Sequence, residues 1–213
     1  MNLVIFDLDG TLVDSKDDLV HSVNATRRWM KLQPLPEDLV ASYVGDGAPM
    51  LIRRAMGPDA TRAQLEEALA YFLGYYREHM LDHTRDYPGV REALEALQQR
   101  GDVMAVLTNK PVRFSRDLVA GLGLGDFFFQ VYGGNSFDEK KPHPIGIDTL
   151  IAEAHADRAR TWMVGDSSTD ILTARNAKVR SVGVTYGIKP ESLHDTPPDV
   201  LLDNMAELPS HIA

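Results

Sequence analysis

The sequence predicts an α/β fold, a doubly wound parallel sheet that carries an inserted all-helical domain. From about residue 90 onward, short apolar runs alternate with segments of helical periodicity, which is typical of a parallel sheet with helices on both faces. Between residues 15 and 84 the pattern is helical only, although a strand-like run, Asn2–Phe6, precedes it. We therefore expect a core domain of residues 1–14 and 85–213, with a helical domain of residues 15–84 inserted after the first strand.

Each helix of the insert is expected from its periodicity and from the residues that interrupt it. Prolines and glycines separate the helical runs, and Thr61 with Gln64 matches a capping box that opens the longest run. Helices are expected at Asp17–Lys31, Pro36–Val44, Ala48–Met56 and from Thr61 to about Leu81. Pro88 and Gly89 then mark the return of the chain to the core.

The remainder of the core is expected to alternate helix and strand. The helices are expected at Val90–Arg100, Val112–Gly121, Pro144–His155 and Thr169–Ala177. The strands are expected at Val103–Leu107, Phe129–Tyr132, Thr161–Val164, Ser181–Val184 and Val200–Leu202. Because these strand runs are short and almost wholly apolar, they suit a sheet that is covered on both faces.

The composition narrows the class of protein. The chain has 213 residues, of which 44% are hydrophobic, enough for a sizeable core. Its formal net charge of −9 argues against nucleic acid or an anionic membrane as a partner, but a small anionic substrate is compatible with a locally cationic site. The absence of cysteine excludes disulfides, thiolate nucleophiles and cysteine zinc sites. We expect no signal peptide and no membrane span, and predict a cytoplasmic monomer or weak homodimer.

Polar residues follow four of the predicted strands, and such strand ends share one edge of a parallel sheet. The residues are Asp7-Leu8-Asp9-Gly10-Thr11, Thr108-Asn109-Lys110, Lys140-Lys141-Pro142, and Gly165-Asp166 through Asp170. The carboxylates of Asp7 and Asp9, two positions apart, repel each other unless a cation or a reaction offsets their charge. We therefore expect a ligand site at this edge.

The residue types at this edge suit Mg²⁺ and a phosphate group. The carboxylates of Asp7 and Asp166, with the backbone carbonyl of Asp9, are the oxygen ligands that Mg²⁺ prefers. Lys141 is expected to pair with phosphate, while Thr108 and the amides near Asn109 donate hydrogen bonds to it. Taken singly, such residues are usually turn residues, helix caps or solvated lysines, so their joint placement carries the inference.

In order and spacing, these four motifs resemble those of the haloacid dehalogenase superfamily, and the resemblance spans the whole chain. The core is similar to the Rossmann-like core of that family, and the insert to its helical cap domain. With Asp14-Ser15 and Lys141-Pro142-His143-Pro144, the pattern is similar to the phosphoglycolate phosphatases among them. The resemblance implies Mg²⁺-dependent hydrolysis of a phosphomonoester through an aspartyl-phosphate, with 2-phosphoglycolate as the first candidate substrate.

The resemblance also implies roles for the motif residues. Asp7 is the expected nucleophile, and Asp9 is expected to protonate the leaving group and then to deprotonate water. Asp166 is expected to bind the metal together with Asp7 and Asp9. Asp170 is expected to support the metal site without contacting the metal directly. The expected catalytic set is Asp7, Asp9, Thr108 and Lys141. The expected phosphate-binding set is Leu8, Gly10, Thr108, Asn109 and Lys141.

Three further features of the sequence have two interpretations each. Gly45-Asp46-Gly47 is either a plain turn or the cap loop that binds the non-phosphate end of the substrate through Gly45, Asp46 and Gly47. The Lys-Pro junction in the family pattern selects Lys141 over Lys140. His79 and His83 lie four apart without a glutamate after the first, so we interpret them as a solvated helix end rather than half of a zinc site.

Several alternative functions stay open. The dehalogenase branch of the superfamily lacks a carboxylate at the position of Asp9, so this residue favours phosphoryl transfer. The open alternatives among enzymes are an inorganic pyrophosphatase, a broad sugar or nucleotide phosphatase, and a β-phosphoglucomutase-like mutase. Arg53 and Arg54 on the predicted cap are basic contacts that suit the mutase. The alternative outside enzymes is a catalytically silent regulatory binding protein.

Overall fold

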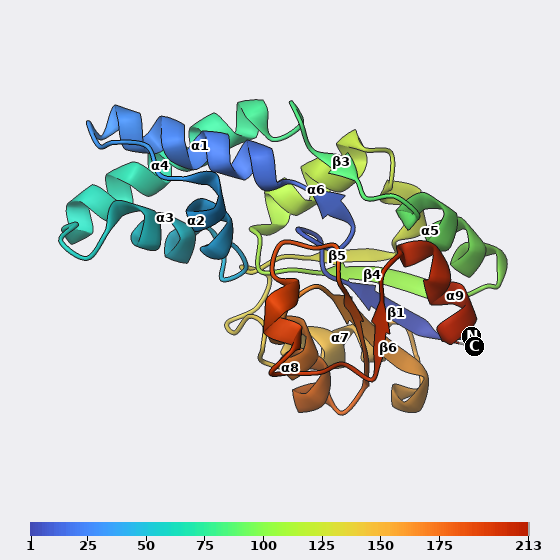
Figure 1. The fold of residues 1–213 in the computed structure, drawn as a ribbon. Helices are drawn as coiled ribbons and strands as arrows, with labels where there is room; N and C mark the ends of the chain where they lie inside the picture. Colours follow the sequence, from blue (N-terminus) through green and yellow to red (C-terminus); the bar gives the residue numbers. More distant parts are fainter. Residues whose placement is uncertain (213) are drawn as a thin grey trace.

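The computed structural model describes residues 1–212, and its centre is a six-stranded parallel sheet (Figure 1). The strands are β1 (Leu3–Phe6), β4 (Val103–Leu107), β5 (Gln130–Tyr132), β6 (Thr161–Gly165), β7 (Arg180–Val184) and β8 (Val200–Leu202). Their order is β5-β4-β1-β6-β7-β8, so the chain winds outward from β1 in both directions. The predicted doubly wound sheet is confirmed, and the carboxyl ends of β1, β4 and β6 lie at the point where its winding reverses.

Helices cover both faces of the sheet because side chains alternate along each strand. In β1, Leu3 and Ile5 join one apolar cluster, whereas Val4 and Phe6 join another. The first cluster includes residues of α7 (Ile145–Glu153) and α8 (Ser168–Ala177). The second includes residues of α5 (Val90–Gln99) and α6 (Val112–Gly121). A short α9 (Leu208–His211) ends the described chain, and the 3₁₀ turns are Gly125–Phe127, Arg158–Arg160, Pro190–Leu193 and Met205–Glu207.

Four consecutive helices form the insert and lie together in Figure 1, apart from the two chain termini. They are α1 (Lys16–Trp29), α2 (Glu37–Ser42), α3 (Ala48–Met56) and α4 (Arg62–His79). The capping box is confirmed, since Gln64 N donates to Thr61 Oγ1 at 3.3 Å and Thr61 N to Gln64 Oε1 at 2.9 Å. The expected helices are present with ends shifted by one or two residues, and the division of the chain into two domains stays a prediction.

A two-stranded ribbon marks where the chain leaves the sheet and returns to it. Strand β2 (Val13–Asp14) pairs antiparallel with β3 (Arg85–Asp86). The sequence did not predict this ribbon, because two residues per strand are too few for a periodic signal. Within residues 1–212, no helix has the length and apolar character needed to cross a membrane.

Asp18 fastens the start of α1 to the segment that returns to the sheet. Its buried carboxylate accepts hydrogen bonds from Thr84 N and Thr84 Oγ1, both at 2.8 Å, and from His83 N at 3.0 Å. Burial opposes ionisation of Asp18, but the hydrogen bonds from Thr84 and His83 outweigh it and lower the pKa of the carboxyl below its ordinary value. Asp18 therefore adds to the β2–β3 ribbon in holding the two crossings between insert and sheet together.

We expect Asp18→Asn to lower the free energy of unfolding by about 2 kcal/mol, because an amide group replaces an ionised acceptor of several buried donors. Urea unfolding followed by circular dichroism measures the loss. The neighbouring and exposed Asp17→Asn is the control and should leave stability nearly unchanged. Equal stability of the two variants would contradict this role of Asp18.

Candidate active site

The structure gathers the residues of all four motifs at one edge of the sheet. Asp7 follows β1, Thr108 follows β4 and Asp166 follows β6, while Asp170 lies in the first turn of α8. Lys141 reaches the same place from the loop before α7. All five residues are buried, with exposed fractions between 0% and 8%. The expected convergence of these residues is thus what the structure shows.

Lys141 lies between two carboxylates. Its Nζ is 2.9 Å from Asp7 Oδ1 and 2.6 Å from Asp170 Oδ1. Burial opposes the positive charge, but Asp170 and Asp7 outweigh it and raise the pKa of Lys141 above its ordinary value. Lys140, in contrast, is exposed and donates to the backbone carbonyl of Asp46. Of the two lysines, it is Lys141 that the structure places in the carboxylate cluster.

The carboxylates at this edge crowd one another. Burial, opposed by Lys141 and reinforced by the charge of Asp170, raises the pKa of Asp7 to about 6. Burial together with the charges of Asp170 and Asp7 raises the pKa of Asp166 to about 7, although the N–H groups of Lys189 and Ile188 oppose the shift. Ionising this cluster is therefore costly, and a bound cation would offset the cost.

The donor set fits a hard divalent cation such as Mg²⁺. Carboxylate oxygens of Asp7, Asp166 and Asp170 lie within 4.8 Å of one another. Asp170 is already engaged, since Oδ1 contacts Lys141 and Oδ2 accepts from Ser167 N at 3.2 Å and Ser167 Oγ at 2.7 Å. Asp7 and Asp166 are thus the side chains that would hold the ion, all-oxygen ligation being what Mg²⁺ prefers. The contribution expected from the backbone carbonyl of Asp9 stays a prediction.

Asp9 is held by groups from both the sheet edge and the helical insert. Lys110 Nζ is 3.0 Å from each carboxylate oxygen, and Ser15 Oγ donates to Oδ1 at 2.6 Å. Lys110 Nζ also donates to the hydroxyl of Tyr76 on α4, at 2.7 Å, and lies 4.5 Å from the centre of its ring. Burial raises the pKa of Tyr76 to about 12, so the phenol stays neutral. This chain of contacts links an insert helix to Asp9.

Asn109 makes a second link between the insert and the sheet edge. Its Nδ2 donates to Gly45 O at 3.0 Å and to Lys141 O at 3.1 Å. Gly47 approaches the same residue so closely that an added Cβ would lie 2.9 Å from Asn109 O. Gly45 and Gly47 line the cavity above Asp7, whereas the Asp46 side chain pairs with Arg54 at 2.6 Å. The loop therefore presents backbone to the cavity.

The remaining predicted phosphate-binding residues contribute backbone. Leu8 has a fully buried side chain, so only its backbone is available to a ligand. Gly10 has φ +85°, and an added Cβ would lie 2.3 Å from Asp166 Oδ2. Thr108 is buried, and its Oγ1 accepts from Lys110 N at 3.3 Å, which leaves the hydroxyl proton available to a ligand. Their roles toward phosphate stay predictions.

A small cavity of about 50 Å³ lies between the sheet edge and the insert. Its polar floor includes Asp7, Asp9, Thr108 and Asp166, and its apolar walls include Leu19, Val44, Leu51, Phe72 and Phe114. At roughly 10–15 Å³ for each water, this volume holds only a few small groups. The cavity suits a small ligand whose polar end meets the floor formed by these polar residues.

Sequence reasoning missed three residues of this cavity. Lys110 was noted within its motif but had no assigned role, and Tyr76 was not singled out. Lys189 also lines the cavity, and burial lowers its pKa below the ordinary value. The position of Lys110 directly after Thr108-Asn109 is a signal that could have identified it.

The fold and this site define a class of proteins with a Rossmann-like parallel sheet, in which an aspartate after the first strand lies beside a lysine and further carboxylates. The model of the haloacid dehalogenase-like hydrolases matches residues 4–184, and the chain belongs to this family. It is 40% identical to a phosphoglycolate phosphatase of Vibrio vulnificus, over 98% of this chain and 94% of that one. It is 41% identical to one of Agrobacterium fabrum, over 97% and 90%.

A solved structure supports the assignment of the chain to this family. The chain superposes on the crystal structure of a predicted phosphoglycolate phosphatase from Haemophilus somnus with a TM-score of 0.95 at 33% identity, covering 100% of this chain and 98% of that one. The structure is thus that of a haloacid dehalogenase-like hydrolase, and its full-length relatives carry the names of phosphatases.

We expect Lys141→Met to lower the free energy of unfolding by about 3 kcal/mol without divalent ions, because it leaves Asp7 and Asp170 buried without their cation. Thermal and urea unfolding measure this loss. Lys140→Met removes an exposed neighbour and should cost under about 0.5 kcal/mol. The prediction fails if Lys140→Met is the more damaging of the two.

Proposed function

We propose that this chain is a Mg²⁺-dependent phosphatase that transfers the phosphoryl group of 2-phosphoglycolate to Asp7 and then to water. The observation that carries the proposal is a buried Asp7 fixed against Lys141, with Asp9 held two residues further on by Lys110 and Ser15. In this proposal Asp7 is the nucleophile, Lys141 is the cation beside it and Asp9 is the carboxylate for proton transfer, and both carboxylates line the cavity. When bound, Mg²⁺ supplies positive charge that stabilises the transferring phosphoryl group.

The residues divide the reaction between them. A carboxylate oxygen of Asp7 forms a bond to phosphorus while the bond from phosphorus to the ester oxygen breaks, and Asp9 gives that oxygen a proton. Water then attacks the phosphorus of the aspartyl-phosphate, Asp9 takes up its proton, and inorganic phosphate leaves. Lys141 and the hydroxyl of Thr108 orient and stabilise the phosphoryl oxygens throughout.

The cavity supports a small substrate with a second anionic group. Its volume is small, and Gly45 and Gly47 bring backbone rather than side chains to its lining. Lys189 also lines the cavity and offers a positive partner to a carboxylate next to the phosphate. The names of the full-length relatives point to the same substrate.

The mutase alternative loses the feature that favoured it. Arg54 pairs with Asp46, and Arg53 and Arg54 line a different hollow together with Tyr43 and Met50. These arginines are therefore not among the residues around Asp7. Pyrophosphate and larger phosphate esters are alternatives that the substrate panel below compares directly.

We expect purified protein to release phosphate from 2-phosphoglycolate much faster than from pyrophosphate, glucose phosphates or nucleotides. EDTA should abolish release and Mg²⁺ restore it, because the transferring phosphoryl group otherwise lacks the positive charge that the metal supplies. Asp7→Asn should be inactive yet folded, as circular dichroism checks. Comparable slow release from every ester would withdraw 2-phosphoglycolate but keep the chemistry, whereas full activity of Asp7→Asn would overturn the mechanism.

We expect Gly47→Val to lower kcat/KM for 2-phosphoglycolate roughly tenfold or more, because its side chain forces the loop away from Asn109. Gly57→Val is the matched control, since Gly57 has a similar φ of +87° but no atom within 4 Å of an added Cβ. The ranking of substrates should change in the first variant only. An unchanged ranking in Gly47→Val would show that this loop does not contribute to specificity.

A further inference from the structure

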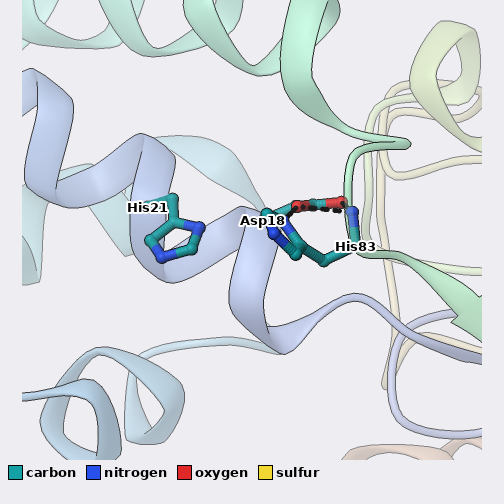
Figure 2. Close-up of side chains that lie close together, drawn as sticks. All are labelled: Asp18, His21 and His83. Atoms are coloured by element: carbon teal, nitrogen blue, oxygen red, sulfur yellow. Dashed lines mark hydrogen bonds and ion pairs between the residues drawn. The ribbon is translucent and has the colours of Figure 1, made fainter.

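Two histidines and one aspartate meet at the junction of the insert and the sheet, outside the catalytic cavity. Asp18 and His21 lie on one face of α1, and His83 lies in the segment after α4 (Figure 2). The rings of His21 and His83 have centroids 5.2 Å apart at 66°, and the three residues offer ligand atoms within 4.8 Å of one another. None of the three lines the cavity above Asp7.

The hydrogen bond between Asp18 and His83 determines which nitrogen of His83 is available. Nδ1 lies 2.8 Å from Asp18 Oδ1, and an ionised carboxylate only accepts, so we infer that Nδ1 carries the proton. The lone pair of neutral His83 is then on Nε2, which Asp18 does not use. A carboxylate that orients a histidine in this way is the common support of metal-binding imidazoles.

Exposure and charge at the cluster favour a cation from solvent. Asp18 is buried and its oxygens are occupied by donors of Thr84 and His83, whereas His21 and His83 are exposed. His21 comes one helical turn after Asp18, so its ring lies on the side of α1 that faces His83. Two imidazoles beside a negative charge suit Zn²⁺ or a similar transition-metal ion better than Mg²⁺.

We propose that His21 and His83 bind one divalent transition-metal ion of the Zn²⁺ type, with Asp18 orienting His83 and water completing the coordination. The ion joins α1 to the segment that returns to β3, beside the hydrogen bonds from Thr84 to Asp18. It therefore reinforces the connection between the insert and the sheet, and it is separate from the Mg²⁺ proposed at Asp7 and Asp166.

The test is calorimetric titration of Zn²⁺ into the full chain, purified without a histidine tag and kept in saturating Mg²⁺ so that the carboxylate cluster is occupied. We expect one Zn²⁺ per chain and a rise in melting temperature on binding. His21→Ala and His83→Ala should each weaken binding at least tenfold. His79→Ala, an exposed histidine paired with Asp82, is the matched control and should bind as the wild type does.

Imidazole NMR signals provide a readout that does not depend on activity. Zn²⁺ should shift the signals of both His21 and His83, and leave those of His79 in place. Equal Zn²⁺ binding in all three histidine variants would overturn the proposal, as would loss of binding in Asp166→Asn with the histidine signals unmoved. Because every readout here is binding or stability, a failure of this site is distinguishable from a failure of the proposed phosphatase activity.

Discussion

The ion pairs of Lys141 with Asp7 and Asp170 are the interaction on which the catalytic edge depends. Three carboxylates are buried together there, and burial raises the pKa values of Asp7 and Asp166 to about 6 and 7. Without a cation such a cluster is costly to ionise. Lys141 opposes the rise in the pKa of Asp7 and so favours its ionised form. Asp170 pairs with Lys141 and also forms the cap of α8 with Ser167. The same contacts thus serve the fold and the chemistry.

The helical insert contributes to this edge rather than merely covering it. Tyr76 on α4 accepts a hydrogen bond from Lys110, which in turn holds Asp9, and Gly45 accepts one from Asn109. A shift of the insert would therefore alter the surroundings of Asp9 and the loop above the cavity together. Such coupling gives a physical route by which closing over a small substrate completes the site and excludes water.

Asp18 has a comparable place at the junction of the insert and the sheet. It joins α1 to the returning segment through donors more than sixty residues away in the chain. His83 is exposed, as we expected of a solvated helix end, and its ring and backbone also bond to Asp18. His79 pairs with Asp82 instead, so the two histidines do not act together. The ring of His83 instead packs against the ring of His21, a contact that the spacing of residues along the sequence did not indicate.

The sequence by itself determined the doubly wound sheet, the helical insert and the four motifs at the strand ends. These depend on short-range patterns, namely apolar periodicity, breakers and the rule that parallel strands share their carboxyl edge. Only the tertiary structure decided that Lys110 binds Asp9 and that the side chain of Asp46 pairs with Arg54. It also brings the rings of His21 and His83 into contact. Lys110 and Asp9 are 101 residues apart, and the pairing of β1 with β4 brings the ends of these two strands side by side. The local periodicity of the sequence carries no information on those contacts, because it does not show which distant side chain packs against a given position.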